Sequence, residues 1–166
     1  MNAAAHKICM VGDFGVGKTS LVARFVRSTF SPKYLTTVGV KVDSKDVALP
    51  GREPLKLVLW DIAGRGELDA LAAHYLRGAS GLLLVADGTR ESSLASALNL
   101  LMQSRLTLPA AAAVVAVNKL DLVERWEVGA ATIAELRRSL PVFETSALSG
   151  DGVEAAFAEL AARVAP

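Results

Sequence analysis

The chain has 166 residues, of which 52% are hydrophobic, and its 18 basic and 17 acidic residues leave a formal net charge of +1. This composition excludes a disordered chain, and the small net charge argues against nucleic acid as a partner. We therefore expect one globular domain, residues 1–166. Its single cysteine, Cys9, excludes an internal disulfide, and its apolar surroundings predict a buried side chain rather than a reactive thiol.

Apolar runs alternate with helical patterns along the chain. We expect strands at 8–11, 38–49, 55–62, 81–86, 113–117 and 142–143, and helices at 19–28, 92–106, 132–140 and 153–164. The turn Pro50-Gly51 predicts a hairpin between the second and third strands. The sequence therefore predicts an α/β domain with a mostly parallel six-stranded sheet, one antiparallel edge strand and helices on both faces.

The segment 12–19, Gly-Asp-Phe-Gly-Val-Gly-Lys-Thr, follows the first expected strand and fits the phosphate-loop pattern G-x-x-x-x-G-K-[ST]. Glycines let backbone N–H groups approach a phosphate, and the helix that follows presents its N-terminus to the anion. Lys18 would add a point charge at the outer phosphates, and the Thr19 hydroxyl is a hard ligand for Mg²⁺. The candidate nucleotide-binding residues of this segment are Asp13, Phe14, Gly15, Val16, Gly17, Lys18, Thr19 and Ser20.

A second motif, Asp61-Ile62-Ala63-Gly64, follows the third expected strand. The Asp61 carboxylate can hold Mg²⁺, usually through a water, and the Gly64 amide can reach a terminal phosphate. Ligands in open α/β sheets bind at the carboxyl ends of the strands, so we expect this motif beside the phosphate loop.

Two further motifs would recognise the base. In Asn118-Lys119-Leu120-Asp121, the carboxylate of Asp121 can accept hydrogen bonds from both N1–H and N2–H₂ of guanine, a pair that adenine does not offer. Asn118 can bridge to the phosphate loop, and the Lys119 stem can lie along the base. In Thr145-Ser146-Ala147, the Ala147 amide can donate to guanine O6, with Ser146 beside it.

Taken in order, these four motifs resemble the guanine-nucleotide-binding domain of Ras-like small GTPases over essentially the whole chain. The Rab branch is the most similar, through the segments 34–40, 60–64 and 75–79. The resemblance implies a P-loop G domain that binds GTP and GDP with Mg²⁺ and hydrolyses GTP. The alanine-rich composition leads us to expect a prokaryotic or otherwise divergent member.

The resemblance also implies roles that spacing alone does not show. By the family pattern, Phe30 packs edge-on against the base, Tyr34 folds over the phosphates, and Thr37 completes the Mg²⁺ shell with Thr19 and Asp61. The segments 31–42 and 63–78 are expected to order with GTP and to relax after hydrolysis. Effectors, exchange factors or activating proteins are expected to bind through residues 31–42 and 60–78. The candidate catalytic residues are Lys18, Thr37, Gly64 and Arg65.

Two positions depart from the family pattern. Arg65 stands where small GTPases usually have the glutamine that orients the attacking water, and Phe14 stands where a small residue is usual. The first hypothesis is that hydrolysis is slow. The alternatives are that Arg65 turns inward and neutralises transition-state charge, or that it only solvates the start of a mobile helix. Phe14 could obstruct a residue inserted by an activating protein, or pack on the loop after Gly64.

Other features concern location and competing functions. The chain shows no signal peptide, no spanning apolar run and no prenylatable cysteine, so we expect a cytoplasmic monomer that reaches membranes only through partners. The main alternative function is a non-hydrolysing GTP-binding scaffold. An ATP-dependent P-loop kinase is a weaker alternative, because Asp121 disfavours adenine.

Overall fold

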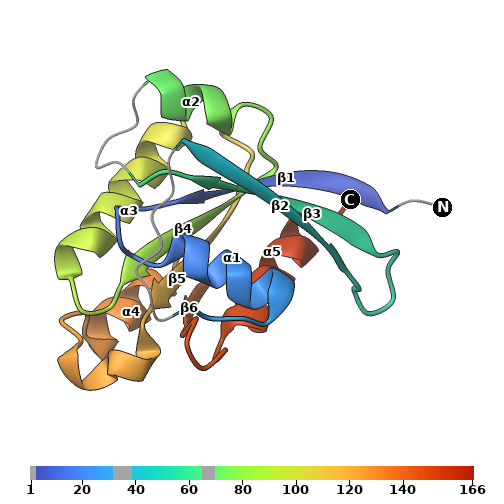
Figure 1. The fold of residues 1–166 in the computed structure, drawn as a ribbon. Helices are drawn as coiled ribbons and strands as arrows, with labels where there is room; N and C mark the ends of the chain where they lie inside the picture. The colour runs from blue at the N-terminus through green and yellow to red at the C-terminus, as the bar shows by residue number, and fades with distance from the viewer. Residues whose placement is uncertain (1–2, 32–38, 65–69) are drawn as a thin grey trace.

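The computed structural model describes residues 3–31, 39–64 and 70–166. Within them, strands form one sheet in the order β2-β3-β1-β4-β5-β6 (Figure 1). The strands are β1 Ala4–Val11, β2 Val40–Val47, β3 Leu55–Ile62, β4 Gly81–Asp87, β5 Ala112–Asn118 and β6 Val142–Glu144. β2 is the antiparallel edge strand, and the other pairs are parallel. The predicted six-stranded architecture is confirmed.

Helices cover both faces of this sheet. They are α1 Lys18–Arg27, α2 Ala70–Leu76, α3 Glu91–Ser104, α4 Ala130–Leu136 and α5 Val153–Val164, with a 3-10 helix, η1, at Leu120–Arg125. α1 and α5 pack on one face, whereas α2, α3 and α4 pack on the other. Each central strand therefore buries both sets of its alternating side chains, which explains why β4 is apolar at six consecutive positions and buried throughout.

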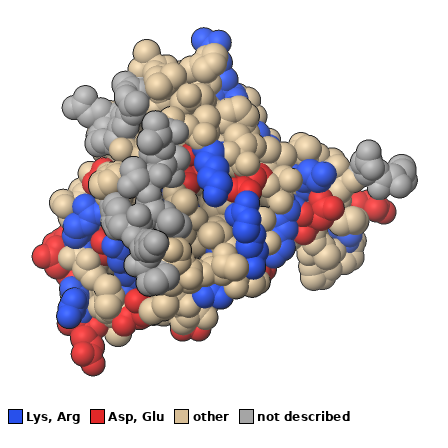
Figure 2. Space-filling view, in the orientation of Figure 1, with Lys and Arg blue, Asp and Glu red and all other residues tan. Residues whose placement is uncertain are grey.

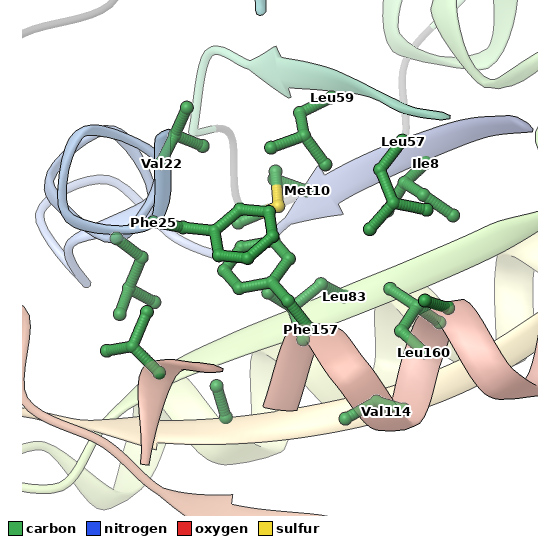
Figure 3. Close-up of a cluster of buried hydrophobic side chains, with 14 of the residues drawn as sticks. Ile8, Met10, Val22, Phe25, Leu57, Leu59, Leu83, Val114, Phe157 and Leu160 are labelled. Carbon is green, nitrogen blue, oxygen red and sulfur yellow. The ribbon is translucent and has the colours of Figure 1, made fainter. Parts of the chain in front are cut away.

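The core beneath α1 and α5 is centred on two aromatic rings (Figure 3). Phe25 of α1 and Phe157 of α5 stack with ring centroids 4.0 Å apart and an interplanar angle of 7°. Both rings are almost fully buried and lie over Met10 of β1. Such a stack adds about 0.5–1.5 kcal/mol to the area that the two rings bury. It ties α1, which follows the phosphate loop, to the closing helix.

The structure differs from the expected element boundaries in several places. β1 begins at Ala4 rather than at residue 8, because Ala4–Lys7 pair with the first half of β3. The short helices α2 and η1 were not predicted. α4 spans Ala130–Leu136 instead of 132–140, and the strand expected at 38–49 is shorter, with residue 38 outside the described residues.

Charged side chains are interspersed on the surface. On the face shown in Figure 2, blue and red residues alternate rather than forming a patch of one sign. Ion pairs account for part of this pattern, among them Arg27 with Asp43 across α1 and β2, and Lys45 with Glu154. No helix in the described ranges has the length and apolar character needed to cross a membrane.

Candidate functional site

The phosphate-loop segment lies between β1 and α1, at the carboxyl ends of the parallel strands. A Cβ at Gly12 would lie 2.3 Å from the carbonyl oxygen of Val85, so only glycine fits there. Gly17 has φ +103°, and a Cβ on it would lie 2.3 Å from Nδ2 of Asn118. The loop therefore passes close to β4 and β5, and its glycines permit that approach.

Lys18 begins α1 and folds back over the loop. Its Nζ donates to the carbonyl oxygens of Gly12 and Asp13 at 3.0 and 3.2 Å, and the residue is 6% exposed. Burial lowers the pKa of Lys18, and the charges of Asp61 and Asp13 only partly offset this effect. A buried ammonium group whose hydrogen bonds go to carbonyl oxygens would be stabilised by a nearby anion. The phosphates of a nucleotide would supply such an anion.

The two described candidates for Mg²⁺ lie together. The Thr19 hydroxyl donates to Oδ2 of Asp61 at 2.6 Å, and Asp61 is 1% exposed at the end of β3. No cluster of three or more His, Cys, Asp or Glu that could hold a metal occurs in the described ranges. A hydroxyl and one carboxylate fit a Mg²⁺ that takes its other ligands from phosphate and water. Thr37 lies outside the described residues.

Gly64 packs directly against the phosphate loop. A Cβ on Gly64 would lie 2.5 Å from the Phe14 nitrogen and 2.6 Å from its Cα. The second motif therefore reaches the loop through close backbone contact. Phe14 is 54% exposed. Its backbone carbonyl oxygen accepts a hydrogen bond from Nη2 of Arg90 at 3.0 Å.

Asn118 joins the phosphate loop to the base-recognition segments. Its Nδ2 donates to the carbonyl oxygen of Val16 at 3.0 Å, and its Oδ1 accepts from the Thr145 hydroxyl at 3.0 Å. Asn118 and Thr145 are 2% and 0% exposed, so both partners of each bond are shielded from water. Three motifs that are far apart in sequence thus meet at one buried amide.

Asp121 is exposed and is oriented by a buried hydroxyl. Ser146 donates its Oγ hydrogen to Oδ1 of Asp121 at 2.7 Å, and the Ser146 oxygen accepts from the Ser149 amide at 3.1 Å. Asp121 lies in η1, directly after the carboxyl end of β5. Ala147 is 4% exposed and follows Ser146 directly.

Arg24 of α1 is hydrogen-bonded to the backbone of the segment around Ala147. Its Nε donates to the Ala147 carbonyl oxygen at 2.8 Å and its Nη2 donates to the Leu148 carbonyl oxygen at 2.6 Å. This residue was not identified from the sequence. Its partners lie 123 and 124 positions away, and no local pattern marks it.

The remaining predicted residues have the following positions. Phe30 is 36% exposed just after α1, whereas Val16 is fully buried and Ser20 half-buried. Tyr34, Thr37 and Arg65 lie outside the described residues. Burial raises the pKa of Cys9 to about 12, consistent with the small buried side chain that we expected.

The six-stranded fold, with the phosphate-loop pattern between β1 and α1 and the other three motifs at strand ends, is that of a P-loop GTPase domain. The model of the Ras family matches residues 7–165, and the chain therefore belongs to that family as a Ras-like small GTPase. The protein is Rab-like: it is 34% identical to the Ras-related protein Rab-13 of Canis lupus familiaris over 158 residues, which cover 93% of this chain and 77% of that relative. Membership makes it a GTP-binding switch protein of the class that meets effectors, exchange factors and activating proteins.

Proposed function

We propose that this protein binds GTP and GDP with Mg²⁺, hydrolyses GTP slowly, and signals through the segments 31–42 and 60–78. Asn118 carries the nucleotide part of this proposal, because its side chain links the loop that would bind phosphate to the segment that would bind the base. A ligand with both a phosphate chain and a purine would engage the two ends of this link together.

The residues of each motif have a different role. Lys18 and the loop amides neutralise phosphate charge, and Thr19 with Asp61 supplies oxygens for Mg²⁺. Asp121 accepts from the guanine edge. Catalysis would come mainly from positioning and charge, with a water attacking the terminal phosphate in line. Thr37 and Gly64 would respond to that phosphate.

Slow hydrolysis is proposed from the chemistry of Arg65. A guanidinium has five donors and no acceptor, so it cannot accept a hydrogen bond from the attacking water as a glutamine oxygen does. Phe14 bears on hydrolysis assisted by a partner. Its exposed ring stands on the loop that a residue inserted by an activating protein would approach.

Changing Arg65 to glutamine is expected to raise the single-turnover rate of GTP hydrolysis by about 10-fold or more, because the amide restores an acceptor for the water. The measurement is phosphate release from preloaded GTP, with Arg138→Gln as the control, since Arg138 is exposed in the turn after α4. A slower Arg65→Gln variant would favour an inward-turned arginine, and an unchanged rate would favour simple solvation. Either result contradicts the proposal that Arg65 slows hydrolysis because it offers the water no acceptor.

The same assay decides between a switch and a scaffold. Phosphate release by the wild type at a measurable rate eliminates the non-hydrolysing scaffold. A wild type that retains intact GTP throughout would instead favour the scaffold.

We further propose a cytoplasmic monomer whose output is effector binding. Trp60 and Tyr75 lie in the proposed partner surface with ring centroids 6.3 Å apart, and Lys7 lies 3.8 Å from the Trp60 ring centroid.

A further inference from the structure

Lys119 has an unusual backbone conformation at the centre of the base-recognition segment. Its φ is +74° and its ψ is 40°, in the left-handed region. A residue with a Cβ is strained in this region, and it persists there where its surroundings fix it. Since Asp121 follows two residues later, the backbone direction at Lys119 affects where Asp121 lies, and Ser146 then orients its carboxylate.

The side chain of Lys119 is fixed by a buried carboxylate. Its Nζ lies 2.9 Å from Oδ2 of Asp87, which is 2% exposed at the end of β4. The amide and hydroxyl of Thr89 hold the other carboxylate oxygen at 2.8 and 2.7 Å. Burial alone would raise the pKa of Asp87, but the hydrogen bonds from Thr89 and Lys119 outweigh it and keep that pKa below its usual value.

The backbone of Lys119 is fixed by an indole. Nε1 of Trp126 donates to the Lys119 carbonyl oxygen at 2.8 Å. The ring of Trp126 lies flat against Gly88, where a Cβ would be 2.1 Å from Cε2. Gly88 in turn donates to the Asn118 carbonyl oxygen at 3.0 Å and accepts from the amides of Glu127 and Val128. The indole therefore packs on a glycine whose own backbone is hydrogen-bonded to β5 and to the segment after Trp126.

We infer that Trp126 and Asp87 are positioning residues that hold Lys119 in its left-handed conformation and so set how long a guanine nucleotide stays bound. The inference rests on the proposed guanine-nucleotide function. Trp126 acts through the carbonyl of Lys119 and Asp87 through its ammonium group. Asp87 also reaches the phosphate loop, because Arg90 lies 3.3 Å from its carboxylate and donates to the Phe14 carbonyl oxygen.

The test variant is Trp126→Phe, which keeps an aromatic ring on Gly88 but removes the indole N–H. Losing this bond leaves the Lys119 carbonyl short of one donor, so release of a fluorescent GDP analogue from the full chain is expected to be about 5- to 30-fold faster. Binding of tripolyphosphate, which has no base, to the nucleotide-free chain is expected to change less than about twofold. A merely structural role would weaken both ligands together.

Asp87→Asn is the second variant and keeps the inference testable if Trp126→Phe does not fold. It retains the shape of Asp87 but loses the charge, so GDP release is expected to accelerate about 10-fold. Tripolyphosphate binding should weaken less than GDP binding, because only the Arg90 contact joins Asp87 to the phosphate loop. Release within twofold of the wild type in both variants, or equal weakening of GDP and tripolyphosphate in either variant, overturns the inference. A wild type that binds no GDP would instead overturn the proposed function.

Discussion

Replacing Asp121 with asparagine is expected to weaken GDP binding by about 10²- to 10⁴-fold and to convert the base preference from guanine to xanthine. The loss follows because a carboxylate that accepts two donors from guanine is exchanged for an amide that presents one acceptor and one N–H₂ group. That N–H₂ group would face the guanine amino group, donor against donor. Xanthine carries a carbonyl oxygen there and would accept from it.

The structure predicts which atom of the new amide would face the base. Ser146 donates to Oδ1 of Asp121 at 2.7 Å, and a carbonyl oxygen of asparagine can accept the same bond. Ser146 therefore orients the amide, leaving its N–H₂ group on the other side. The measurement compares dissociation constants for GDP and xanthosine diphosphate. Ser146→Ala removes the hydroxyl that orients the side chain at position 121. It is expected to weaken binding of both GDP and xanthosine diphosphate. An Asp121→Asn variant that keeps its preference for GDP would contradict the assignment.

Replacing Lys18 with methionine is expected to abolish most nucleotide binding while leaving the fold as stable as before, or more stable by about 1 kcal/mol. The two effects have different causes. Without nucleotide, Lys18 is a buried cation whose Nζ has the carbonyls of Gly12 and Asp13 as its hydrogen-bond acceptors, and removing such a charge in favour of an apolar side chain is often neutral or stabilising. With nucleotide, the lost charge-assisted bonds correspond to about 10²- to 10⁴-fold in affinity.

The measurement pairs calorimetry of GTP binding with chemical unfolding of the nucleotide-free protein. Lys56→Met is the matched control, because Lys56 is a half-buried lysine on β3 at the end remote from the phosphate loop. It should change neither GTP affinity nor the preference between nucleotides. A Lys18→Met variant that binds GTP within tenfold of the wild type would contradict the role given to Lys18.

Sequence reasoning identified the sheet because the physical signal for each central strand is local. The run at 81–86 is apolar at every position, and the structure buries it on both faces. The phosphate loop was equally visible, since its spacing reflects close contacts of Gly12 with Val85 and of Gly17 with Asn118. α2 was missed because its seven residues carry little helical periodicity.

The residues that support the site were not visible in the sequence. Arg24 binds carbonyls more than 120 positions away, and Arg90 reaches Phe14 across 76 positions. Asp87 and Trp126 stand in no motif, because their effect depends on the left-handed backbone of Lys119 and on the bare surface of Gly88. These supporting residues come together only in the folded protein. Motif spacing could therefore predict the residues that would contact the nucleotide, but not the residues that position them.

Competition for bound nucleotide tests the central claim most directly. Fluorescent GDP is bound to the full chain with Mg²⁺ and displaced by increasing GDP, GTP or ATP. If Asp121 reads the guanine edge and the phosphate loop holds the rest, GDP and GTP should displace the probe at similar concentrations. ATP should fail to displace it at about 1,000-fold higher concentration, since a site built for guanine leaves its carboxylate unpaired against adenine. Displacement by ATP at concentrations similar to GTP would contradict the account.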